Sequence, residues 1–180
     1  EIGKIFADRR QQWAAWSAIH DVMKLFDESD YLENQEKIEL TEDFAKVLQE
    51  FGFYSQVIER NEALIEYLKN EEKVDHERVT EVLKNIASIH LKSWGGSRAI
   101  KAYLRVLDEL ENQNLDEPKG EILFQIGFCY WKMSDTEEAK DYFFKAISNF
   151  KEFHGANHLH VGKTYYYIGR VCYTDWDYEE

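Results

Sequence analysis

The chain has 180 residues, of which 44% are hydrophobic and 15% aromatic, far more apolar side chain than an intrinsically disordered segment carries. Its formal net charge of −13 argues against nucleic acid and anionic membranes as partners, because phosphate binding needs clustered lysine and arginine. With one proline and nine glycines, turn signals are few, and the composition favours an all-α fold of long helices.

Other features of the whole chain bear on its cellular setting. The two cysteines, Cys129 and Cys172, lie within helical patterns and are too few for a disulfide framework, so we expect inert, buried thiols. The sequence has neither an apolar run of about eighteen residues nor a signal peptide, and we therefore expect a cytoplasmic protein. Because no methionine precedes Glu1, we also expect a fragment of a longer chain.

Residues 1–37 are predicted to form a partial repeat made of two helices. Gly3 lies on the apolar face of the first helix, and Ala15 and Ile19 lie on the apolar face of the second. The two tryptophans of this region also suit a helix that lies on a membrane surface or on a partner. The repeat register favours packing of the second helix against the first.

The next two segments repeat this pattern at a spacing of about 40–42 residues. In residues 38–79, an apolar helix precedes a turn at Gly52 and a second helix follows. In residues 80–119, Ala87 lies in the first helix and Ala99 in the second. Each segment is therefore predicted to be a helical hairpin.

Residues 120–161 carry the clearest copy of the repeat, and residues 162–180 begin another. Gly127 on the first helix and Ala139 on the second would let the two backbones approach closely, with Phe143 one turn further along. Larger side chains at the two small positions would push the helices apart. Residues 162–180 match only the first helix of the unit, so we expect a second partial repeat there.

The spacing of these small and aromatic residues resembles the tetratricopeptide signature. The matching positions in the clearest repeat are Gly127, Tyr130, Ala139, Phe143, Ala146 and Lys151. The long repeat, and the motif formed by Gly155, His158 and Val161, are similar to the kinesin-light-chain-like branch and to helical peptide-sensing domains of bacterial signalling proteins. The resemblance implies a single array over residues 1–180, a right-handed superhelix of antiparallel helical hairpins.

In such arrays the first helix of each hairpin faces a concave groove, where a peptide or protein partner binds. The outward positions of these helices are predicted to bind the partner through aromatic anchors, amides and cations. The predicted partner-binding residues are Lys84, Asn85, Ser88, Phe124, Gln125, Phe128, Trp131, Lys163, Tyr166, Tyr167 and Arg170. Packing of these aromatic rings between repeats is the alternative interpretation.

One specific partner class can be tested on these positions. The carboxylate clamp of chaperone-binding tetratricopeptide domains needs lysine and asparagine on one first helix, asparagine on the next, and lysine and arginine on the third. The equivalent positions here are Lys84, Ser88, Gln125, Lys163 and Tyr167. Three of these five types differ from the clamp, which argues against binding of a chaperone tail.

The remaining chemical signals are weak. His154, His158 and His160 are close enough in sequence to suggest zinc, but the turn at Gly155 breaks the spacing that would align them on one face. No phosphate loop, catalytic triad or cofactor motif occurs, so we expect neither an enzyme nor a cofactor or metal. The sequence predicts a protein-interaction scaffold, with a peptide-sensing regulatory domain of a larger signalling protein as the alternative and self-association through uncapped array ends as a third role.

Overall fold

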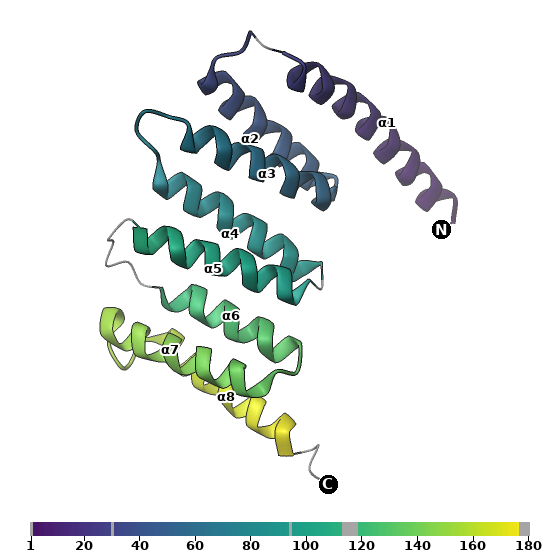
Figure 1. The fold of residues 1–180 in the computed structure, drawn as a ribbon. Coiled ribbons are helices and arrows are strands. Elements are labelled where there is room, and N and C mark those ends of the chain that lie inside the picture. The colour runs from purple at the N-terminus through teal and green to yellow at the C-terminus, as the bar shows by residue number, and fades with distance from the viewer. Residues whose placement is uncertain (1, 30, 94, 113–118, 177–180) are drawn as a thin grey trace. The chain divides into compact units, whose positions relative to one another are not determined.

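The computed structural model describes residues 2–29, 31–93, 95–112 and 119–176, with the side chains of residues 2–13, 15 and 174–176 left out. Within these ranges the chain forms eight α-helices and no strands (Figure 1). It separates into two compact units, Glu1–Asp75 and His76–Glu180. A single array over residues 1–180, with the repeat boundaries given above, stays a prediction.

Unit 1 contains α1 (Ile2–Asp27), α2 (Asn34–Glu50) and α3 (Tyr54–Lys69). The main chain of Glu33 donates a hydrogen bond to the carboxylate of Glu36, part of a capping box that starts α2. Gly52, with φ +76°, turns the chain from α2 into α3. The predicted hairpin of residues 38–79 is therefore present as α2 and α3.

The two-helix prediction for residues 1–37 is wrong, because Ile2–Asp27 form one continuous helix of 26 residues. Between Gly3 and Asp27 the sequence has no glycine or proline to end the first helix. Within unit 1, α1 contacts the hairpin through aromatic pairs and one ion pair. The ring of Trp16 lies 5.1 Å from that of Phe53, centroid to centroid.

Unit 2 contains α4 (His76–Lys92), α5 (Gly96–Asn112), α6 (Gly120–Lys132), α7 (Thr136–His154) and α8 (Leu159–Trp176). α4 packs on α5, α6 on α7, and α7 on α8, which confirms the hairpins predicted in residues 80–119 and 120–161. Apolar side chains at helical spacing fill the space between them, and fully buried examples are Val79, Ile86, Val106, Ile126, Phe143 and Val171.

The close approach of α6 and α7 depends on Gly127. A Cβ atom there would lie 2.8 Å from the ring of Phe143 and 3.2 Å from the carbonyl oxygen of Ala139, so any larger residue would force the helices apart. The predicted reason for a small residue at this position is therefore confirmed. None of the helices, as far as their residues are described, has the length and apolar character that crossing a membrane requires.

Candidate partner-binding surface

Aromatic side chains of α6, α7 and α8 gather in unit 2, in what we call the aromatic cluster. Its members are Phe124, Phe128, Trp131, Phe143 and Tyr167. The ring of Tyr167 on α8 lies 5.3 Å from that of Phe124, 5.6 Å from that of Phe128 and 5.6 Å from that of Trp131. All three contacts are edge to face, the arrangement that ring quadrupoles favour. One tyrosine of α8 thus binds three rings of α6.

Helical spacing explains why α6 supplies three rings to this cluster. Phe124, Phe128 and Trp131 are four and three residues apart, so they lie on one face of the helix. Phe128 and Trp131 are half-buried, and their centroids lie 5.5 Å apart. The outer part of the cluster is therefore an aromatic surface whose rings are fixed by one another.

Three cations lie against rings of the aromatic cluster. Lys163 Nζ lies 4.6 Å from the ring centroid of Phe124, and the guanidinium of Arg170 lies 4.6 Å from that of Trp131. Lys132 Nζ lies 5.5 Å from the centroids of both Phe128 and Trp131. Each such cation–π contact is worth about 0.5–1 kcal/mol at an exposed site. A chain with net charge −13 therefore presents a local surface of aromatic rings and positive charge.

Most of the predicted partner-binding residues meet at this surface. Ring and cation contacts join Phe124, Phe128, Trp131, Lys163, Tyr166, Tyr167 and Arg170. Gln125 is half-buried on the same helix, where its amide donates a hydrogen bond of 2.8 Å to Glu121. The predicted residues of α4 do not enter the cluster: Lys84 is exposed, and the Ser88 hydroxyl donates a 2.9 Å hydrogen bond to the carbonyl of Asn85.

The outward position predicted for Phe124 is wrong. Its side chain is only 4% exposed and belongs to the core, in contact with Phe143 at a centroid distance of 5.4 Å. The cause is that α6 packs against α5, α7 and α8, so its buried arc is wider than that of a helix with one neighbour. Tyr166, by contrast, is 61% exposed.

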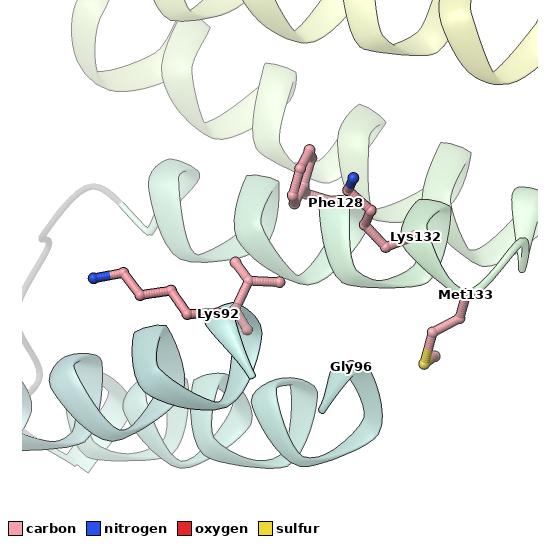
Figure 2. A pocket seen from close by; sticks show the side chains of 6 residues that line it. Lys92, Gly96, Phe128, Lys132 and Met133 are labelled. Atoms are coloured by element: carbon pink, nitrogen blue, oxygen red, sulfur yellow. The ribbon is translucent and has the colours of Figure 1, made fainter. Parts of the chain in front are cut away.

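A pocket adjoins the aromatic cluster, between the α4–α5 hairpin and α6; we call it the α4–α6 pocket. It has a volume of about 300 Å³ and is lined by Leu91, Lys92, Gly96, Phe128, Lys132 and Met133. Figure 2 shows Phe128, Lys132 and Met133 on α6 and its end, and Lys92 and Gly96 on the facing hairpin. Among the described residues, its lining combines apolar side chains with two lysines and has no carboxylate.

Of the residues that line this pocket, only Phe128 is among the predicted partner-binding residues. A Cβ atom on Gly96 would lie 2.7 Å from the sulfur of Met133, so the glycine makes room for a side chain from another hairpin. The spacing of Phe128 and Lys132 by one helical turn was the one signal available in the sequence.

The three histidines near Gly155 form a stack at the turn between α7 and α8. Ring centroids lie 4.6 Å apart for His154 and His158 and 5.0 Å apart for His158 and His160, and His160 stacks on Phe150 at 5.0 Å. Among the described residues, no group of three or more histidine, cysteine, aspartate or glutamate side chains is arranged to hold a metal ion.

Desolvation, together with the neighbouring His154 and His160, lowers the pKa of His158. The unfolded chain therefore takes up a proton at this residue more readily than the folded chain does. We expect the free energy of unfolding of unit 2 to fall as the pH drops through about 6.5. Urea denaturation at a series of pH values measures this, and His158→Gln should flatten the pH dependence. The matched change His20→Gln in unit 1 should leave it as it is; equal slopes in wild type and His158→Gln would contradict the assignment.

The two cysteines differ from each other, although both were predicted to be buried. Cys129 on α6 is fully buried, and desolvation raises the pKa of its thiol to about 11, so it is inert as expected. Cys172 on α8 is exposed, and the prediction for it is wrong. Cys129 lies close enough to Tyr103 of α5 to affect its pKa, whereas no described helix covers the side of α8 that carries Cys172.

Comparisons with known proteins bear on the fold. No family model matches the chain, and no curated protein matches it. Solved structures do match. BtubC (BKLC) from P. vanneervenii is 17% identical with a TM-score of 0.65, over 95% of this chain and 68% of that one. A putative kinesin light chain from Podosopora anserina with nearly identical TPR-like repeats is 10% identical with a TM-score of 0.63, over 95% and 84%.

The chain has a TPR-like helical repeat fold. A third similar structure is a Rap protein complexed with competence and sporulation factor, which is 16% identical with a TM-score of 0.57, over 94% of this chain and 46% of that one. The chain thus spans less than half of the Rap protein. At these identities the likeness concerns the fold, and the kinesin-light-chain-like branch stays a prediction.

Proposed function

We propose that the chain is a protein-interaction scaffold whose unit 2 binds a peptide or a segment of another protein along α6 and α8. The observation that carries this proposal is the outer part of the aromatic cluster, where Arg170 and Lys132 lie over Trp131. Tryptophan, tyrosine and arginine dominate the energetics of protein interfaces. Rings that are held by one another lose little conformational freedom when a partner binds.

The positive charges at this surface indicate the chemistry of a suitable partner. Lys163, Arg170 and Lys132 cover the rings, and Lys92 lies in the adjoining α4–α6 pocket. A segment with apolar or aromatic anchors and neighbouring acidic residues complements both features. Nucleic acid and membranes are not proposed as partners, since the net charge of the chain is −13.

The proposal predicts that Tyr166→Ala combined with Arg170→Ala weakens peptide binding at least tenfold. Each residue lies at the surface in contact with the other, and removal of one such anchor typically costs more than about 1 kcal/mol. Peptides selected from a random library on the wild-type chain would be measured by calorimetry against both proteins. Equal affinities for the two proteins would contradict the proposed surface.

Tyr165→Ala provides a matched control on the same helix. Tyr165 is 47% exposed and makes its contact with Lys151 of α7, away from the aromatic cluster. Its removal should leave peptide affinity unchanged. If it weakens binding as much as the double variant, the peptide lies on another face of α8.

The alternative proposal is a peptide-sensing regulatory domain of a larger signalling protein. Its support is the likeness to the Rap protein complexed with competence and sporulation factor. Under this proposal, the peptide selected above changes the activity or assembly of the full-length parent protein. A scaffold would bind the peptide without such a response.

Self-association is a further proposal for the open face of α8. Tyr166 and Tyr173 are 61% and 64% exposed there, and a second copy could cover them. Sedimentation over a wide range of concentration tests this, because a monomer at every concentration would exclude it.

A further inference from the structure

A second hollow lies in unit 1, apart from the surface described above, between α1 and α3; we call it the α1–α3 cleft. It has a volume of about 430 Å³, within the range of ligand pockets, roughly 300–1,000 Å³. Its lining residues are Trp16, His20, Met23, Lys24, Asp27 and Glu28 on or next to α1, and Gln56, Glu59 and Arg60 on α3.

The buried side of the cleft is built around Arg60. This side chain is nine-tenths buried, and its two terminal nitrogens donate hydrogen bonds of 2.6 and 2.7 Å to the two carboxylate oxygens of Asp27. The hydrogen bond to Asp27 raises the pKa of Arg60, with a smaller contribution from the negative charge of Glu59, so the guanidinium stays charged and Asp27 is its hydrogen-bonded partner. An additional anion is therefore not required.

One nitrogen of the Arg60 side chain has no hydrogen-bond acceptor among the described residues. This nitrogen, Nε, is buried. A buried donor without an acceptor is unfavourable, and a bound acceptor that reached it after a small shift of the surrounding side chains would satisfy it. A ligand of this cleft is thus expected to bring an oxygen atom, such as a peptide carbonyl, to Arg60.

The cleft as a whole has a small excess of negative charge. Its described lining residues include three carboxylates, Asp27, Glu28 and Glu59, and two cations, Lys24 and Arg60. Asp27 binds Arg60, and Glu28 lies 3.9 Å from Lys24. Within the part of the chain that the structure describes, the carboxylate of Glu59 makes no ion pair. This carboxylate is therefore available to a cation from outside.

Aromatic rings form the wall of the cleft. The ring of Trp16 is tilted against that of His20, with centroids 5.4 Å apart, and also packs on Phe53; the two contacts fix the indole plane. Tryptophan is the strongest aromatic partner for a cation. Met23, only 4% exposed, adds apolar surface for an aliphatic stem.

We propose that the α1–α3 cleft binds a lysine or arginine residue of a partner peptide, with its cation at Glu59 and Trp16 and its carbonyl oxygen at Arg60 Nε. The unpaired N–H donor, the carboxylate and the aromatic wall together match the main chain and side chain of one basic residue, and no acidic or apolar residue satisfies all three. The site lies in unit 1 and does not depend on the surface proposed for unit 2.

The test uses the full chain and three small probes in nuclear magnetic resonance titrations. N-acetyl-lysine-methylamide should shift the Nε signal of Arg60 and the indole signal of Trp16. The norleucine analogue has the same stem without the charge, and the glutamate analogue has the opposite charge; both should bind at least tenfold more weakly. Equal binding of norleucine would overturn the proposal, as would tighter binding of glutamate or no shift with any probe.

Two variants test the proposed contact with Glu59 directly, and neither changes Arg60 or Asp27. Glu59→Gln should weaken binding of the lysine probe about tenfold, since the amide keeps the shape of the carboxylate and removes the negative charge that attracts the cation. Glu66→Gln changes an exposed carboxylate on the same helix that does not line the cleft and should have no effect. Equal losses in the two variants would show only a general effect of charge and would overturn the proposed contact.

Discussion

Phe143→Ala is expected to lower the free energy of unfolding of unit 2 by about 3–5 kcal/mol, the usual cost of removing a buried phenylalanine. Its side chain is fully buried. It lies against Gly127, and its ring is 5.4 Å from that of Phe124 and 6.1 Å from that of Tyr167. The change therefore removes the ring that joins α6, α7 and α8. Urea denaturation followed by circular dichroism measures the loss.

The neighbouring residue is a natural control for this prediction. Phe144 is the next residue of α7, but its side chain is 54% exposed. Phe144→Ala should change the free energy of unfolding by no more than about 0.5 kcal/mol. Similar losses in the two variants would mean that α7 faces the core with a different side from the one described here.

Helical periodicity predicted the hairpins but not the N-terminal region. Where glycine separates two apolar faces, as at Gly52, the structure has a turn at the predicted place. For residues 1–37 the repeat pattern predicted two helices, although the sequence between Gly3 and Asp27 has no glycine or proline to end the first of them. A match to small and apolar positions alone does not distinguish two short helices from one long helix.

The sequence predicted which residues of α6 share the aromatic face, but not how deeply each of them is buried. Spacing along α6 correctly grouped Phe128 with Trp131, because residues three and four apart share a helical face. Burial of Phe124 depends on how many helices pack around α6, a property of the whole unit. The α4–α6 pocket was missed for the same reason, since Gly96 and Met133 meet only when separate hairpins pack.

The two glycines at equivalent positions of α6 and α8 should respond in opposite directions to the same change. Gly127→Ala is expected to lower the free energy of unfolding of unit 2 by about 1–3 kcal/mol, the cost of overpacking a filled core. The new Cβ atom would lie 2.8 Å from the ring of Phe143 and 3.2 Å from a main-chain oxygen of α7. Neither neighbour is the mobile end of a long side chain, so the helices must separate. Urea denaturation of unit 2 measures the loss.

Gly169 tests whether this cost comes from the helix contact or from the glycine itself. A Cβ atom at Gly169 would meet none of the described atoms within 4 Å, because no described helix covers that face of α8. Alanine in a helix interior is then worth roughly 0.5–1 kcal/mol over glycine, so Gly169→Ala should stabilise unit 2. A loss of stability in Gly169→Ala would indicate that another segment or a second copy covers this face in solution, with Gly169 holding it as Gly127 holds α7.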